Sequence, residues 1–143
     1  MKTLATTFLL LTFFISSGQS PKVYSTKSGA IRGYDPVSYF TKGEPTKGSE
    51  EFTAEWNGAT WYFSSAENLE AFKQTPEDYA PQFGGYCAYA VSQGYTYQAS
   101  PEAWKIVDDR LYLNYSKGIQ RKWETKQAEF IKAANTNWPG LIK

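Results

Sequence analysis

The sequence contains no histidine, a single cysteine, Cys87, and a single methionine, Met1. Without an imidazole, neither a Ser-His-Asp triad nor a Cys-His pair forms within the chain. Zinc and haem sites with histidine ligands are excluded for the same reason. A lone cysteine forms no disulfide within one chain, so the hydrophobic core has to hold the fold. These absences favour a binding protein over an enzyme.

The N-terminal residues have the layout of a secretory signal peptide. Lys2 supplies a basic start, residues 4–15 form an uncharged apolar run, and three small residues end it at Gly18. The run is shorter than the roughly 20 residues that a membrane-spanning helix needs. We therefore predict cleavage after Gly18, export to the periplasm or out of the cell, and no stable membrane insertion afterwards. A retained N-terminal anchor is the alternative.

An excess of charge of one sign is also lacking. The chain has 15 basic and 14 acidic residues, and Lys2 is the one charged residue in the segment 1–18. The predicted mature chain is therefore neutral and has little long-range attraction for nucleic acid or anionic lipid. We expect no nucleic-acid partner.

Aromatic residues are abundant, at 17% of the chain. They are able to fill a small core and leave some rings to line a pocket or an interface. The length predicts one folded domain at residues 31–143, preceded by the signal peptide 1–18 and a flexible segment at 19–30.

Local patterns predict an α+β domain. In residues 51–63, two alternating runs flank Asn57-Gly58, which is a strong hairpin signal. Ser64 begins a capping box for a short helix that ends near residue 74. Further signals are a short turn capped by Asp35 and a second hairpin from 104–107 and 111–114. A C-terminal helix over 117–134 is capped by Ser116, and Trp138-Pro139 closes the domain.

Cys87 lies in the apolar stretch 86–91, whose periodicity fits a helix and a strand alike. As a structural residue it is a buried small hydrophobe. As a functional residue it is a reactive thiol, because Gly84 and Gly85 allow backbone amides to approach the sulfur and lower its pKa. Its neighbours Tyr86 and Tyr89 fit the core better than a ligand role, but they are candidates to line a pocket.

Several spaced motifs resemble the YHS domain family. They are Tyr34-Asp35-Pro36-Val37, Trp61-Tyr62-Phe63-Ser64-Ser65, Phe72 followed by Pro76-Glu77-Asp78-Tyr79, and FGGYCAYAVSQG from Phe83 to Gly94. Residues 30–141 are similar to a longer, exported branch of this family. The resemblance implies a small α+β fold with a hairpin followed by a helix.

The resemblance also implies functions. Short members bind metals through cysteines, including modules attached to copper-transporting ATPases, and those cysteines fall at the positions of Ser38, Ser64 and Asn68. None of these is a thiolate, so the ligand set does not carry over. The longer branch resembles proteins with a selenoprotein label, whose selenium residue is expected at the position of Cys87. That label implies a thiol or redox role.

Three functions remain open from the sequence. The first is binding or homeostasis of copper or another transition-metal ion through Cys87, with oxygen ligands or a second chain in a dimer. The second is thiol redox chemistry at Cys87, which needs a partner thiol or a small reductant because no resolving cysteine is present. The third is a non-catalytic ligand-binding or structural module. The family context favours the first function, whereas the shortage of metal ligands argues against it. The candidate pocket residues are Tyr34, Asp35, Gly84, Gly85, Tyr86 and Tyr89.

Overall fold

A computed structural model describes residues 18–143. The predicted signal peptide therefore lies outside the described residues, except for Gly18. Over residues 18–143, no helix combines the length and the apolar character that crossing a membrane requires.

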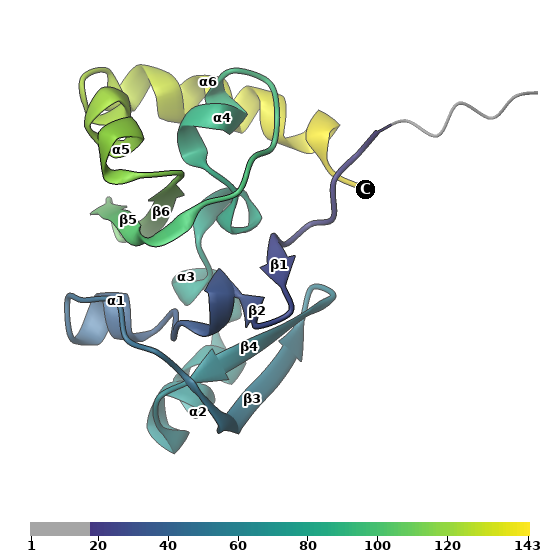
Figure 1. Ribbon diagram of the computed structural model, residues 1–143, viewed down its shortest axis with the longest axis vertical. Coiled ribbons are helices and arrows are strands. Elements are labelled where there is room, and N and C mark those ends of the chain that lie inside the picture. The colour runs from purple at the N-terminus through teal and green to yellow at the C-terminus, as the bar shows by residue number, and fades with distance from the viewer. Residues whose placement is uncertain (1–17) are drawn as a thin grey trace, which may run out of the picture.

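The described chain forms a small α+β domain with two halves, as the sequence predicted (Figure 1). One half holds the elements from β1 to α2, the other holds those from η2 to α6, and α3 lies between them (Figure 1). In chain order the elements are β1 (Ser25–Thr26), β2 (Gly29–Ala30), η1 (Ile31–Gly33), α1 (Ser38–Thr41), β3 (Ser49–Trp56), β4 (Ala59–Phe63), α2 (Ala66–Gln74), α3 (Pro76–Tyr79), η2 (Gln82–Gly85), α4 (Ala88–Ser92), β5 (Ser100–Val107), β6 (Arg110–Asn114), α5 (Lys117–Glu124) and α6 (Gln127–Leu141).

The first half is built on the hairpin predicted at Asn57-Gly58. β3 and β4 pair antiparallel across these two residues, whose φ angles are 49° and 76°. Positive φ at both positions matches the right-handed twist of the two strands, which explains why Asn-Gly is favoured there. The buried Trp61 of β4 packs against Phe72 of α2, with ring centroids 5.1 Å apart.

Helix α2 begins one residue later than the capping box predicts. Ser65, not Ser64, is the N-cap, and its hydroxyl accepts a hydrogen bond from the Asn68 N–H at 3.1 Å. Ser64 is instead bonded to the buried carboxylate of Asp35. Ser64, which the local sequence predicts as the N-cap, therefore makes a tertiary hydrogen bond and does not cap the helix.

The second half contains the second predicted hairpin and the short helix α4. β5 and β6 pair antiparallel around Asp108 and Asp109, which both have positive φ. Arg110, expected in the connection, is the first residue of β6. The ambiguous stretch 86–91 contributes most of α4, which is almost entirely buried and packs against α6.

The predicted C-terminal helix is two helices. α5 ends where the Thr125 hydroxyl bonds to the Lys122 carbonyl at 2.6 Å and Lys126 leaves helical geometry at φ −139° and ψ 45°. A side chain that takes a backbone carbonyl in this way competes with the helical ladder. α6 then continues through Pro139 to Leu141, seven residues beyond the predicted helix end at Ala134. Trp123 and Ala134, predicted to face inward, are both fully buried.

The segment 19–30, predicted to be flexible, is packed on the domain. Ser20 bridges to Ile142 next to the C-terminus, the Tyr24 N–H donates to the Gly84 carbonyl at 2.9 Å, and Val23 is buried. Its polar composition gave no sign of this, because backbone hydrogen bonds hold most of it in place. Residues 19–24 are called the N-terminal arm below.

Candidate functional site

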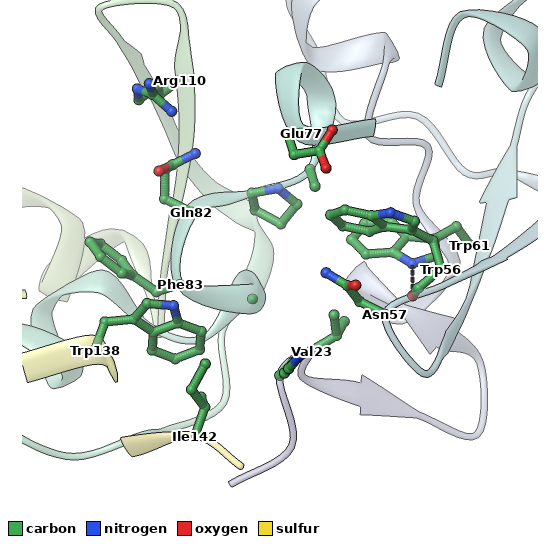
Figure 2. A pocket seen from close by; sticks show the side chains of 14 residues that line it. Val23, Trp56, Asn57, Trp61, Glu77, Gln82, Phe83, Arg110, Trp138 and Ile142 are labelled. Atoms are coloured by element: carbon green, nitrogen blue, oxygen red, sulfur yellow. Dashed lines mark hydrogen bonds between the residues drawn. The ribbon is translucent and has the colours of Figure 1, made fainter. Parts of the chain in front are cut away.

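A cleft of about 290 Å³ lies between the two halves of the domain (Figure 2). Its walls come from the N-terminal arm, the β3–β4 turn, α3, η2, the start of β6 and the end of α6. Ligand sites occur preferentially where two parts of a fold meet, and their volumes usually start at about 300 Å³. The cleft therefore has the place and the size of a site for a small molecule.

Two pairs of aromatic rings form the walls. Trp56 and Trp61 lie on one side, and Phe83 and Trp138 lie on the other (Figure 2). The rings of Trp56 and Trp61 are 5.7 Å apart at 61°, and those of Phe83 and Trp138 are 5.9 Å apart at 68°. The Trp61 Nε1–H donates to the Trp56 carbonyl at 3.0 Å and fixes the first pair. Aromatic walls of this kind favour flat, apolar parts of a ligand.

A strained turn sets the position of Phe83. Phe83 and Gly84 both have positive φ, 57° and 62°, which costs a side chain such as that of Phe83 on the order of 1–3 kcal/mol. A Cβ on Gly84 would overlap the backbone carbonyl of Lys22 in the N-terminal arm. Gly84 therefore allows the arm to cross this turn directly, and the crossing closes one end of the cleft.

The charged groups of the cleft lie at its rim. Glu77 of α3 stands above the Trp56–Trp61 pair, while Gln82 and Arg110 stand above Phe83 (Figure 2). Glu77 and Arg110 are exposed. Lys73 and Glu70 form the one salt bridge among residues 18–143, so Glu77 and Arg110 take part in none there. The cleft thus combines an apolar interior with charges of both signs at its opening.

Cys87 does not line the cleft. Only 2% of the residue is exposed. Its Sγ accepts the Tyr115 N–H at 3.2 Å and donates to Oδ1 of Asn114 at 3.6 Å. Burial raises the pKa of the Cys87 thiol, and backbone hydrogen bonds near Ala90, Tyr115 and Tyr89 oppose that rise in part. The thiol is held protonated and away from solvent.

The fully buried Asn114 positions this thiol. Its Oδ1 accepts the Tyr89 N–H at 3.1 Å as well as the thiol, so the amide oxygen faces α4. Its Nδ2 has no hydrogen-bond partner. Asn114 therefore joins β6 to the start of α4 at the position of Cys87.

The sequence positions that the family resemblance singled out meet around Asp35. Oδ1 of this buried carboxylate accepts the Val37 N–H at 2.8 Å. Oδ2 accepts the Ser64 N–H at 2.8 Å, the Ser64 hydroxyl at 2.7 Å and Nδ2 of Asn68 at 2.8 Å. The Ser38 hydroxyl lies 3.4 Å from that of Ser64 and 3.5 Å from Nδ2 of Asn68. We call Asp35, Ser38, Ser64 and Asn68 the Asp35 network.

The remaining predicted pocket residues lie in different places. Gly84 is the one that lines the cleft. Tyr34 is partly buried against the hydrophobic core that contains Val37, Tyr39 and Phe63. Gly85 lies against Pro81. Tyr86 is buried behind the cleft, where its ring contacts Trp138 and its hydroxyl donates to the Pro21 carbonyl at 3.0 Å. The Tyr89 ring packs on Phe130, with Nζ of Lys122 5.0 Å from its centroid.

Sequence reasoning missed most of the cleft. The sequence predicts Trp56 and Trp61 as residues of a hairpin and Trp138 as the close of the domain, with nothing to link them. Their common feature in the sequence is the excess of aromatic residues, which indicated a pocket without locating it. The pairing of segments 20–24, 82–84 and 138–142 depends on tertiary backbone contacts that no local pattern reveals.

Residues 37–83 match the family model for the YHS domain. The match covers about a third of the chain, and the resemblance seen in the sequence is confirmed over these residues. It covers α1, β3, β4, α2 and α3 and ends at the start of η2. No curated protein and no solved structure matches the chain. Metal binding is ascribed to the YHS family, and the chain is compatible with a metal-binding role to that extent.

The residues of the Asp35 network do not fit a transition-metal ion. They contain no thiolate or imidazole, which copper(I) and zinc prefer. Oδ2 of Asp35 already accepts three hydrogen bonds. Within residues 18–143, no three His, Cys, Asp or Glu side chains gather closely enough to hold a metal ion. A hydrogen-bonded network occupies the place where short relatives are expected to carry cysteines.

Proposed function

We propose that this protein is a non-catalytic binding protein that holds a small organic molecule in the cleft between its two halves. The observation that carries this proposal is the convergence of Trp56, Trp61 and Trp138, three of the five tryptophans, on one cavity. They come from segments more than 70 residues apart in the chain. A ligand with a flat apolar group would pack between them and leave water.

The contrast with Cys87 supports the same proposal. Trp56 and Trp138 of the cleft are partly exposed, while the thiol is 2% exposed, hydrogen-bonded on both sides, and lines no part of the cleft. A reactive thiol needs access and a lowered pKa, and burial has raised the pKa here. The thiol redox alternative therefore has less support than ligand binding.

A flat neutral probe tests the proposal directly. Indole is titrated into the residue 19–143 protein, and binding is followed by the NMR signals of the tryptophan Nε1–H groups and of the backbone. We expect shifts at Trp56, Trp138 and residues 82–84, and affinity about tenfold weaker in Trp138→Ala. Trp104→Ala is the control, because Trp104 lies on β5 and lines a different hollow. Shifts confined to other surfaces would overturn the proposal.

Copper binding through Cys87 is a second candidate, supported by the metal binding ascribed to the YHS family. An ion would have to displace the contacts of Cys87 with Tyr115 and Asn114. Titration of the protein with Cu(I) against a competing chelator decides this. An affinity that Cys87→Ser leaves unchanged excludes Cys87 as a ligand.

We place the binding function outside the cytoplasm, in the periplasm or in the secreted fraction, because of the basic and apolar N-terminal layout. N-terminal sequencing of the protein recovered from its native host tests this. A mature chain that begins at Gln19 is the expected result, and a chain that keeps residues 1–18 in the cytoplasm would contradict it.

A further inference from the structure

The two charged residues Glu77 and Arg110 stand on opposite lips of the tryptophan-lined cleft. Glu77 comes from α3 at the junction of the halves, and Arg110 is the first residue of β6. Figure 2 shows Glu77 on the side of Trp56 and Trp61, and Arg110 on the side of Phe83. Neither forms a salt bridge within the described part of the chain.

We infer that the ligand is a free amino acid with a flat apolar side chain, whose carboxylate binds Arg110, whose ammonium group binds Glu77, and whose side chain lies between the aromatic walls. This inference rests on the proposed function and gives it a substrate class. It needs both charges of the ligand, because each lip offers a counterion for one of them.

Electrostatic complementarity favours a zwitterion over an ion of one sign. A purely anionic ligand would meet Glu77 as a like charge, and a purely cationic one would meet Arg110. Like-charge contacts across an interface are costly and exclude the wrong partners. Guanidinium groups bind carboxylates through two parallel hydrogen bonds, and the Gln82 amide lies beside Arg110 (Figure 2).

The size of the cleft agrees with this class. At about 290 Å³, it falls at the lower limit of ligand pockets, which suits an amino acid better than a peptide or a nucleotide. The third charged residue of the cleft is Lys22, whose backbone crosses Gly84 in the N-terminal arm. Its ammonium group is the alternative partner for a carboxylate, and the experiment includes it.

Four probes separate the contributions of the ligand's groups. They are L-phenylalanine, 3-phenylpropionate without the ammonium group, phenethylamine without the carboxylate, and L-alanine without the ring. Calorimetric titration of the residue 19–143 protein is expected to give the tightest binding for L-phenylalanine. L-alanine is expected to bind weakest, because it leaves the aromatic walls uncovered.

Two charge-neutralising variants test which residue binds which charged group of the ligand. Arg110→Gln should lower the affinity for L-phenylalanine and for 3-phenylpropionate about three- to tenfold and leave the affinity for phenethylamine unchanged. Glu77→Gln should lower the affinity for L-phenylalanine and for phenethylamine by a similar factor and leave the affinity for 3-phenylpropionate unchanged. Arg121→Gln and Glu67→Gln, which remove exposed charges away from the cleft, should change none of these affinities.

Each alternative outcome overturns the inference. Equal affinity for L-phenylalanine and phenethylamine would show that the carboxylate contributes nothing, so the ligand need not be a zwitterion. If Lys22→Gln weakens L-phenylalanine binding and Arg110→Gln does not, Arg110 is not the carboxylate partner. Indole binding that depends on Trp138, together with failure of all charged probes, refutes the amino-acid ligand and keeps the proposed function. Absence of indole binding as well refutes both.

Discussion

Ser64 donates two hydrogen bonds to one oxygen of Asp35, from its N–H at 2.8 Å and from its hydroxyl at 2.7 Å. Nδ2 of Asn68 adds a third at 2.8 Å, and the Val37 N–H bonds to the other oxygen. The buried carboxylate thereby joins the start of α1 to the end of β4 and to α2. It links the elements from which the first half of the domain is built.

Asp35→Asn should destabilise the protein by about 1–3 kcal/mol. The substitution leaves at least one buried donor facing an amide NH₂ group, and a buried donor without a partner costs about 1–3 kcal/mol. Urea unfolding followed by far-UV circular dichroism measures the loss. Asp78→Asn is the control, since Asp78 is exposed on α3 and should change stability by less than about 0.5 kcal/mol. Equal losses for the two variants would show that the Asp35 network carries no special stability.

The geometry of the Asp35 network predicts that cysteines will turn it into a metal site. The Ser38 and Ser64 hydroxyl oxygens, which stand where cysteine sulfurs would stand, lie 3.4 Å apart. Nδ2 of Asn68, one bond beyond the place of a cysteine sulfur, lies 3.4–3.5 Å from both. Thiolates on one tetrahedral zinc ion stand about 3.8 Å apart, given Zn–S bonds of about 2.3 Å. The triple variant Ser38→Cys/Ser64→Cys/Asn68→Cys should therefore bind Co²⁺ and show thiolate-to-cobalt absorption that Zn²⁺ abolishes.

The unsubstituted protein is the first control for this gain, because it still contains Cys87 and should give no such band. A second control places cysteines at Glu67, Glu70 and Lys73, which are exposed on α2 and lie outside the network. If the triple variant stays folded and binds one equivalent of Co²⁺ no better than this control, the three positions do not form a site.

Local signals were sufficient for most elements of the fold. Asn57-Gly58 fixed the first hairpin because both residues tolerate positive φ, and Ser116 caps α5 as predicted. The errors have tertiary causes. Ser64 donates its hydroxyl hydrogen bond to Asp35, and the N-cap of α2 is therefore Ser65. The Thr125 hydroxyl interrupted the last helix.

The site was far less accessible to sequence reasoning than the fold. Cys87 is the one thiol of the chain and therefore the obvious candidate in the sequence. Its surroundings depend on Asn114, which lies 27 residues away on β6. The cleft depends on Gly84 allowing Lys22 to cross it. A glycine pair signals close backbone approach, but its partner in the approach is not encoded nearby.

The buried thiol of Cys87 predicts a loss of stability at alkaline pH. Burial raises its pKa in the folded protein, so its contribution is fully present below the unfolded-state pKa of about 8.5. Above that pH the unfolded thiol ionises while the folded one keeps its proton, and stability falls until the folded pKa is reached. The difference in unfolding free energy between the parent protein and Cys87→Ala should therefore shrink from pH 7 to pH 9.5.

The comparison with Cys87→Ala isolates the thiol from the buried tyrosines. Burial also raises the pKa values of Tyr39, Tyr86 and Tyr112, and these groups are common to both proteins. If the difference in unfolding free energy between the parent protein and Cys87→Ala stays constant or grows with pH, the loss of stability does not come from the Cys87 thiol. In the same samples at pH 8, a disulfide reagent should modify the folded thiol much more slowly than the thiol of the urea-unfolded chain.

Gly84→Ala tests whether the crossing of the N-terminal arm holds the cleft together. The new methyl group would collide with the Lys22 carbonyl, and the residue would also keep a positive φ of 62°. We expect a loss of about 2–4 kcal/mol in unfolding free energy. Hydrogen exchange at the Tyr24 N–H, which bonds to the Gly84 carbonyl, should accelerate more than exchange in β4.

Gly94→Ala separates the collision from the backbone strain. Gly94 has a φ of +94°, but its Cβ would meet no atom within 4 Å. This control should therefore lose only the conformational part, about 1–2 kcal/mol, and leave Tyr24 exchange unchanged. Because the arm lines the cleft, Gly84→Ala should also weaken indole binding, while Gly94→Ala should not. Equal behaviour of the two variants would mean that the arm does not depend on its contact with Gly84 and does not shape the cleft.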